Sequence, residues 1–341
     1  MKALVKARPE PGIWMQQVPR PEPRSGEVLI KISKTAICGT DLHLVRWDAF
    51  AARFFHPPRI IGHEFVGAIA ALGQGVKGFA VGERVTGEGH ITCGACRHCR
   101  NGLRHLCPNT QGIGSGHDGA FAEYLVMPAE NLWRVPPEVP SEVAAIHDPL
   151  GNAVHTALAF DLVGKDVLIT GAGPIGIMAA KICGFAGARH VVLTDVNDYR
   201  LGLARSMGID QAINVAHDTI DDVRLSLAMD DGFDIGLEMS GNPTAFNDMI
   251  AQLCHGGNIA ILGFIPPSTT INWDDVIFKQ LTLKGIYGRK IFTTWEQMTR
   301  MLLSGLDVAP IITHRFPIDR YQAAFDLALS GECGKVILEW E

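Results

Sequence analysis

Four cysteines lie close together in one short stretch of the chain. They are Cys93, Cys96, Cys99 and Cys107, with the spacing C-x2-C-x2-C-x7-C. Thiolates at this density can bind one ion tetrahedrally, and zinc is the usual metal when all four ligands are sulfur. An iron–sulfur cluster is the alternative, but the seven-residue gap differs from the ferredoxin spacing. Because all four positions around the metal would be filled, the spacing predicts a structural zinc site.

A second set of possible metal ligands lies upstream of this cluster. Cys38 is followed by the adjacent pair His63 and Glu64. A catalytic zinc needs three protein ligands and one open position for water or substrate, and these residue types can provide them. Taken singly, each has an ordinary explanation as a core thiol, a loop histidine or a surface acid. Asp148 and its neighbour His147 are two further polar candidates, and their spacing does not rank one above the other.

A glycine-rich turn further along the chain suits a dinucleotide. Gly171, Gly173 and Gly176 follow an apolar strand-like segment and open a helical one. In this context the glycines permit a tight turn, close approach of a pyrophosphate and close helix packing. The next strand-like segment ends at Asp195, 24 residues after Gly171. An acid there can accept hydrogen bonds from ribose hydroxyls and repel a 2′-phosphate, which favours NAD over NADP. Arg200 could instead bind a phosphate, or stack on adenine.

The elements that hold this turn alternate regularly between strand and helix patterns. Continuous apolar strands separated by helices predict a parallel sheet covered on both faces, and six such strands match a doubly wound dinucleotide fold. The predicted strands are 166–170, 190–195, 211–215, 233–239, 258–263 and 281–287. The predicted helices are 174–187, 198–207, 219–228, 243–253 and 273–279.

The first ~145 residues have a different pattern, rich in Gly, Pro and short alternating runs such as 27–37 and 123–127. This pattern predicts an irregular antiparallel β domain with long functional loops. The final stretch offers a helix, a strand, the helix 319–329 and a closing strand at 335–340, which we expect to rejoin the first domain. We therefore predict a first domain of residues 1–147 and 290–341, with a metal lobe at about 88–110. The dinucleotide domain is predicted at 148–289.

Composition excludes several other classes of protein. The chain has 341 residues, with 47% hydrophobic and 19% charged, which is ordinary for a globular protein of two domains. Its net charge is −6, so nucleic acid and anionic membrane are not expected partners. The first residues lack the apolar core of a secretory signal, so we expect a cytoplasmic protein whose eight cysteines serve as metal ligands or free thiols. Cys183, Cys254 and Cys333 are expected to be buried or incidental thiols.

These motifs resemble the zinc-containing medium-chain alcohol dehydrogenase family along nearly the whole chain. The likeness rests on the phrases at 35–43, 87–94, 148–156, 238–241, 284–289 and 310–314. It implies an α/β protein with a GroES-like catalytic domain around a Rossmann domain, usually a homotetramer, with NAD and two zinc ions per subunit. It also implies catalytic zinc on Cys38, His63 and Glu64, with Asp148 close by and a proton relay through Thr40 and His43. Further cofactor contacts implied by the likeness are Ile175, Arg200, Leu262, Gly263, Phe264, Ile286 and Tyr287.

The narrower phrases at 87–94, 148–156 and 284–289 resemble the branch of this family that oxidises L-threonine to 2-amino-3-oxobutanoate. The alternative is the same zinc chemistry on a polyol such as sorbitol or 2,3-butanediol. A non-catalytic nucleotide-binding protein on the same fold is a third hypothesis, which the presence of all three candidate ligands disfavours. His90 is a candidate for substrate recognition, although it could equally be a loop histidine. Family members vary beside Asp148, and His147 there could alter the pH optimum.

Overall fold

In the computed structural model, which describes residues 1–340, the chain forms two units. The first unit comprises 1–149, 290–295 and the stretch from 312 onward, and the second comprises 150–289 and 296–311. Glu341, the last residue of the predicted first domain, lies outside the described residues. No helix within residues 1–340 is both long and apolar enough to cross a membrane.

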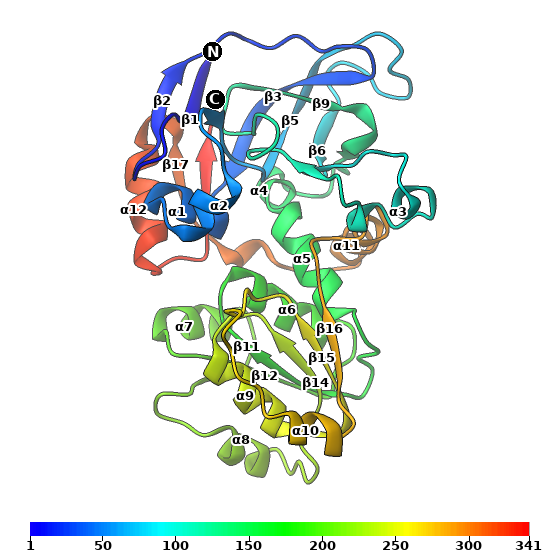
Figure 1. The fold of residues 1–341 in the computed structure, drawn as a ribbon, viewed down its shortest axis with the longest axis vertical. Coiled ribbons are helices and arrows are strands. Elements are labelled where there is room, and N and C mark those ends of the chain that lie inside the picture. The colour runs from blue at the N-terminus through cyan, green and yellow to red at the C-terminus, as the bar shows by residue number, and fades with distance from the viewer. Residues whose placement is uncertain (341) are drawn as a thin grey trace. The chain divides into compact units, whose positions relative to one another are not determined.

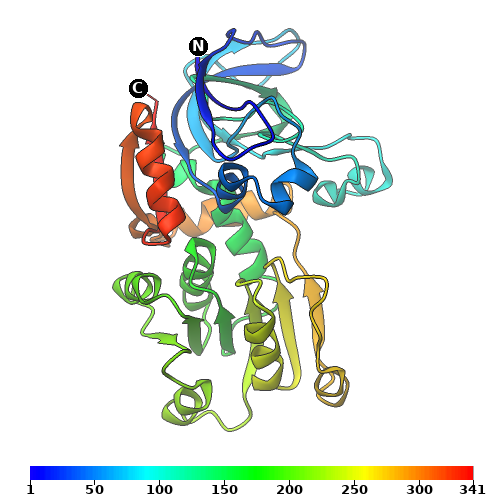
Figure 2. The ribbon, with the colours of Figure 1, turned by 60° about the vertical axis from the view of Figure 1, so that its left-hand side comes forward.

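The apolar segments of the second unit form one six-stranded parallel sheet. Its order is β13-β12-β11-β14-β15-β16, so the chain starts in the middle and winds outward in both directions. The strands lie side by side in Figures 1 and 2. This is the doubly wound order 3-2-1-4-5-6, as predicted. The strands are β11 (Asp166–Thr170), β12 (His190–Asp195), β13 (Gln211–Asn214), β14 (Phe233–Glu238), β15 (Leu253–Ile261) and β16 (Thr282–Gly285).

Helices connect these strands and cover the sheet. From β11 the chain adds strands toward β13, and from β14 it adds strands in the opposite direction, toward β16. Because crossovers between parallel strands are right-handed, the helices of these two halves lie on opposite faces of the sheet. Phe233, Phe246 and Met249 are among the fully buried side chains of the resulting core. The connecting helices are α6 (Pro174–Phe185), α7 (Asp198–Ser206), α8 (Ile220–Ser226), α9 (Pro243–Gln252) and α10 (Trp273–Phe278). The helix α11 (Thr293–Leu303) follows the last strand, and its residues are divided between the two units.

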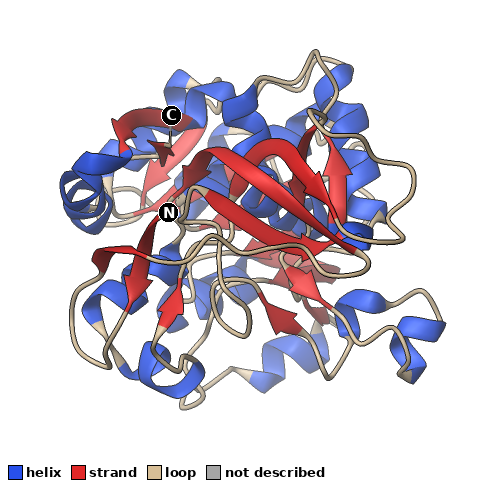
Figure 3. Ribbon diagram, turned by 90° about the horizontal axis from the view of Figure 1, so that it is seen from above, coloured by secondary structure: helices blue, strands red, loops and turns tan. Residues whose placement is uncertain are grey.

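The first unit is built mainly from antiparallel strands, as its short alternating runs predict. A seven-stranded sheet has the order β10-β6-β5-β3-β18-β17, and β9 also pairs with β3. Figure 3 shows its curved strands in red. Because β18 pairs with β3, the C-terminal strands join a sheet made by the N-terminal residues. The strands are β1 (Lys2–Lys6), β2 (Trp14–Gln17), β3 (Glu27–Ala36), β4 (Arg59–Ile60), β5 (Phe65–Leu72), β6 (Arg84–Gly87), β7 (His90–Ile91), β8 (Gln111–Gly112), β9 (Tyr124–Pro128), β10 (Leu132–Arg134), β17 (Ile312–Pro317) and β18 (Lys335–Glu339).

Several short helices of this unit had no clear periodic signal in the sequence. The helix α1 illustrates the reason, because it has only eight residues and is set by local caps. Asp41 at its third position accepts a hydrogen bond from the Cys38 backbone amide (2.9 Å), which fixes the first turn. The short helices are α1 (Gly39–Arg46), α2 (Ala49–Phe54), α3 (Arg97–Arg100) and α4 (Ser141–Ala145). The helix predicted at 319–329 is present as α12 (Tyr321–Ser330), and α5 (His147–Ala157) has its first three residues in the first unit and the others in the second.

Candidate active site and metal centres

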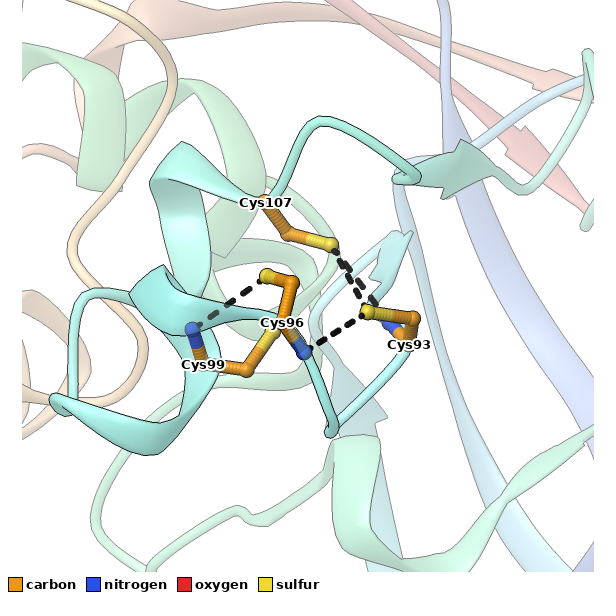
Figure 4. Close-up of side chains that lie close together, drawn as sticks. All are labelled: Cys93, Cys96, Cys99 and Cys107. Carbon is orange, nitrogen blue, oxygen red and sulfur yellow. Dashed lines mark hydrogen bonds between the residues drawn. The ribbon is translucent and has the colours of Figure 1, made fainter.

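The four cysteines of the predicted sulfur cluster converge on one point (Figure 4). All four sulfur atoms lie within 4.8 Å of one another, and Cys93 Sγ is 3.6 Å from Cys107 Sγ. Backbone amides point at the sulfurs, because Cys96 N donates to Cys93 Sγ (3.4 Å) and Cys99 N to Cys96 Sγ (3.5 Å). Such N–H groups stabilise thiolates. The donor set therefore fits a tetrahedral metal such as zinc.

The thiols of this cluster differ in acidity. Hydrogen bonds from the backbone amides of Ala95 and Cys96 lower the pKa of Cys93 to about 6. Burial raises the pKa of Cys99 to about 11. Since metal ligands must be deprotonated, a metal binding here would release at least the Cys99 proton near neutral pH. The backbone amides thus favour the thiolate form of Cys93, whereas Cys99 would lose its proton only when a metal binds.

The second predicted ligand set also comes together. One ligand atom each from Cys38, His63 and Glu64 lies within 4.8 Å of the others. Cys38 is the residue just before α1, and His63 and Glu64 immediately precede β5. The Glu64 carbonyl accepts a hydrogen bond from Ala36 N (3.1 Å) at the end of β3, which brings the two ligand segments together. One sulfur, one imidazole and one carboxylate leave a fourth position open, as in catalytic zinc sites.

A buried lysine that sequence reasoning missed lies against this ligand set. Lys335 Nζ is 2.6 Å from Glu64 Oε2 and donates to the Ile37 carbonyl (2.7 Å). Both side chains of the ion pair are almost inaccessible, and Glu64 Oε1 has no hydrogen-bond partner among the described residues. Burial raises the pKa of Glu64 to about 7, although Lys335 opposes this. A bound cation would satisfy the orphaned oxygen, so the residues fit a metal here.

Two of the other predicted catalytic residues lie near the same ligand set. Thr40 Oγ1 is 3.9 Å from Cys38 Sγ, and His43 is three residues further along α1, on the same face of the helix. Asp148 is buried at the start of α5. Its charge acts on both His63 and Glu64, since it raises the pKa of each. Thr40 and Asp148 thus lie near the three candidate ligands.

His90 belongs to a buried network whose other members the sequence did not reveal. Its Nδ1 lies 2.8 Å from Glu88 Oε1, and Trp295 Nε1 donates to Glu88 Oε2 (2.9 Å). Glu88 and Trp295 are fully buried, whereas the His90 side chain is 26% exposed. A Cβ added at Gly89 would lie 3.8 Å from His63 Cβ, so this loop packs on the mixed ligand set. Glu88 and Trp295 are 207 residues apart, a distance at which local patterns carry no signal.

His147, the other polar candidate beside Asp148, is fully buried. Its Nδ1 is 2.8 Å from the Val143 carbonyl, which can only accept, so Nδ1 carries the hydrogen. Nε2 has no hydrogen-bond partner among the described residues, and the ring faces Trp295 with 6.0 Å between centroids. Burial lowers the pKa of His147 to about 4. His147 is therefore neutral at physiological pH.

This burial predicts a measurable loss of stability in acid. Between pH 6.5 and about 4 the unfolded chain binds a proton at His147 that the folded chain does not, so the free energy of unfolding falls with pH by about 3 kcal/mol. His147→Phe removes this term, and Val143 O keeps its bond from Ile146 N. We expect chemical denaturation at pH 7 and 4.5 to show a smaller loss for the variant. The exposed His217→Gln should behave as wild type, and parallel losses in all three proteins would contradict the prediction.

The glycine turn has the geometry that a dinucleotide requires. Gly171 has φ of 95°, and a Cβ at Gly176 would lie 1.9 Å from the Gly171 carbonyl, so neither position tolerates a side chain. Gly173 is the N-cap of α6 and faces open space. Asp195, at the end of β12, accepts hydrogen bonds from Ala172 N (2.6 Å) and Val196 N (2.7 Å). The turn lies beside the junction of β11 and β14, where doubly wound sheets bind nucleotides.

The other predicted cofactor residues are distributed around the carboxyl ends of the same strands. Ile175 is in the first turn of α6 and Arg200 in α7. Leu262, Gly263 and Phe264 follow β15, while Ile286 and Tyr287 follow β16. Glu238, at the end of β14, was missed as a positioning residue. It is fully buried, and its Oε1 accepts from Ser240 N (2.9 Å) and Gly241 N (2.8 Å), which shapes the neighbouring loop.

Comparison with known proteins agrees with this geometry. The family model of the alcohol dehydrogenase GroES-like domain matches residues 24–137, and that of the zinc-binding dehydrogenases matches residues 174–304. The solved structure of a short chain alcohol dehydrogenase from E. coli CFT073, complexed with NADH, is similar to this chain with a TM-score of 0.91 and 27% identity, covering 100% of this chain and 99% of that one. Fold and site thus define a zinc-binding dehydrogenase with a GroES-like domain and a doubly wound α/β domain.

Curated relatives narrow the assignment. The L-threonine 3-dehydrogenase of Aeromonas hydrophila is 60% identical and that of Proteus mirabilis 58% identical, each over 341 residues and 100% of both chains. The chain belongs to the L-threonine 3-dehydrogenase family.

Proposed function

We propose that the protein oxidises L-threonine to 2-amino-3-oxobutanoate, with NAD as the hydride acceptor. The observation that carries the proposal is the cluster of Cys38, His63 and Glu64 beside Thr40, in a chain 57–60% identical to curated L-threonine 3-dehydrogenases over its whole length. Oxidation of a secondary alcohol removes one hydride and one proton. In the proposal, the mixed metal ligand set with its relay residues removes the proton, and NAD at the glycine turn accepts the hydride.

The residues described above fit two zinc ions per subunit. Cys93, Cys96, Cys99 and Cys107 would hold the structural ion, and Cys38, His63 and Glu64 the catalytic one. When bound at the mixed set, zinc supplies Lewis-acid activation of the substrate hydroxyl. Thr40 would accept the hydroxyl proton and pass it to His43, which carries it to solvent because 44% of its side chain is exposed. Asp148 would act on the same centre through its charge.

For the cofactor, we propose that the amides at the start of α6 receive the pyrophosphate of NAD beside Gly171, Gly173 and Gly176. Asp195 would accept hydrogen bonds from the adenosine ribose and repel the extra phosphate of NADP. The supporting contacts proposed are Ile175, Arg200, Leu262, Gly263, Phe264, Ile286 and Tyr287.

For the substrate, we propose His90 as a recognition residue. Glu88 fixes the ring through Nδ1, and His90 remains partly exposed beside the mixed ligand set. Removal of the ring should weaken binding of the amino acid more than it slows the chemistry. His90→Asn is expected to raise KM for L-threonine about 10-fold, the loss of one polar contact, with a smaller change in kcat. His98→Asn, in the metal lobe, is the control; equal KM values for both variants and wild type would contradict this role.

The test of the proposed function is NADH formation by zinc-loaded protein. L-threonine, sorbitol, 2,3-butanediol and ethanol are compared under NAD and NADP. Preference for L-threonine with NAD is the expected result. Preference for a diol would retain the zinc chemistry and replace the substrate, and preference for NADP would contradict the role of Asp195. No turnover on any substrate, with two zinc ions per chain verified, would contradict an enzymatic function.

We also propose that residues 1–147 and 290–341 are the catalytic domain and 148–289 the NAD domain of a cytoplasmic homotetramer that binds neither nucleic acid nor membrane. Net charge −6 and the family resemblance support this proposal. Light scattering coupled to size exclusion measures the assembly, and a mass of one or two chains would contradict it.

A further inference from the structure

A carboxylate that neither the sequence motifs nor the metal sites account for contacts the relay histidine. Asp48 Oδ2 lies 2.5 Å from His43 Nδ1. The helix α1 ends between them: Trp47 adopts the left-handed conformation (φ 52°), and the His43 carbonyl accepts from Asp48 N (3.5 Å). This turn brings the Asp48 side chain back to the His43 ring.

Asp48 is itself held in place by α2. Its Oδ1 accepts hydrogen bonds from Phe50 N (3.0 Å) and Ala51 N (3.1 Å), so the residue is the N-cap of that helix. The Phe50 ring packs on the His43 ring, with 4.9 Å between the two centroids. The Asp48 carboxylate thus joins the end of α1 to the start of α2, since Oδ2 contacts His43 and Oδ1 caps α2.

The contact determines which nitrogen of His43 carries the hydrogen. Burial alone would raise the pKa of Asp48, but the hydrogen bonds from His43, Ala51 and Phe50 lower it below the usual value. An ionised carboxylate can only accept, so His43 Nδ1 must be the donor. In the neutral ring Nε2 then has a free lone pair. A relay histidine needs such an acceptor nitrogen on the side that receives the proton.

We propose that Asp48 is a positioning residue of the proton relay, which holds His43 in the Nδ1–H tautomer with Nε2 as the proton acceptor. The inference rests on the proposed function, and specifically on His43 as a relay residue. In the step considered, the O–H bond of the substrate alcohol breaks and an N–H bond forms at His43 Nε2, through the Thr40 hydroxyl. Asp48 stabilises the resulting imidazolium without taking up a proton, and solvent then removes the Nε2 proton.

Two substitutions separate this role from capping of α2. Both Asn and Ser are good N-cap residues, so Asp48→Asn and Asp48→Ser should retain the helix and a melting temperature close to wild type. An Asn amide facing Nδ1 donates a hydrogen and so favours the opposite tautomer, whereas Ser is too short to reach the ring. NADH formation in a single turnover of the zinc- and NAD-loaded enzyme with L-threonine is measured for both variants, for His43→Ala and for the double variant.

We expect His43→Ala to slow NADH formation about 10²-fold, the lower range for a general base. Asp48→Asn should slow it about 10-fold, more than Asp48→Ser. In the His43→Ala background, Asp48→Asn should have no further effect, because its target is absent.

Four outcomes would overturn the inference. A wild-type rate in Asp48→Asn would show that the carboxylate is not needed, and equal losses in the Asn and Ser variants would remove the tautomer assignment. A loss that persists fully in the His43→Ala background would show a structural role instead. A wild-type rate in His43→Ala would refute the relay role of His43. The proposed function would still stand in that case, because the enzyme would still oxidise L-threonine.

Discussion

Replacement of Cys38 by serine is expected to lower turnover of L-threonine about 10³-fold and to reduce bound zinc from two ions per subunit to one. Lewis-acid activation by a metal ion contributes several kcal/mol to transition-state stabilisation, and each 1.4 kcal/mol is tenfold in rate. Serine keeps the size of the side chain and is a favourable N-cap, so α1 should remain intact. Zinc analysis and NADH formation measure the two effects.

The matched control for this variant is Cys254→Ser. Cys254 is a partly buried free thiol in β15 that belongs to neither ligand group. The Cys254→Ser variant should retain two zinc ions per subunit and wild-type turnover. Full activity of Cys38→Ser with a single zinc ion would show that the mixed set is not the catalytic centre.

Replacement of Cys96 by serine is expected to release the other zinc ion and to lower the melting temperature by about 10 °C. Cys96 is both a member of the sulfur cluster and the N-cap of α3, where it accepts from Cys99 N. Structural zinc binding is worth about 10–16 kcal/mol in isolated fingers. We expect about 3–5 kcal/mol of this binding energy to contribute to the free energy of unfolding, which corresponds to a change of about 10 °C in the melting temperature of a chain of this size.

Two measurements distinguish a structural ion from a merely bound one. Zinc stoichiometry should fall to one per subunit, and limited proteolysis should cut between residues 93 and 107 in Cys96→Ser before it cuts elsewhere. Cys254→Ser is again the control. An unchanged melting temperature after loss of the ion would contradict a structural role for the cluster.

The sequence alone determined the organisation of the second unit, because its signals are local. The six strands and five helices between 166 and 287 were predicted with ends within a few residues, except that β15 begins at Leu253, five residues before the predicted start. The extension arises where Phe233 pairs with Leu253 across an irregular register, which depends on a partner strand. The glycine turn at Gly171 and Gly176 and the convergence of the four cysteines could likewise be predicted, since each depends on residues close in sequence.

The tertiary structure decided which distant side chains share a site. Lys335 begins an apolar strand and shows no sign of its ion pair with Glu64, which forms because β18 docks beside β3 and buries both charges. Glu88 likewise meets Trp295 across 207 residues of sequence. A buried charge or polar group must find a partner, but the chain does not specify locally which one. Residue types and short spacings therefore predicted the chemistry, and long-range burial selected the side chains that surround it.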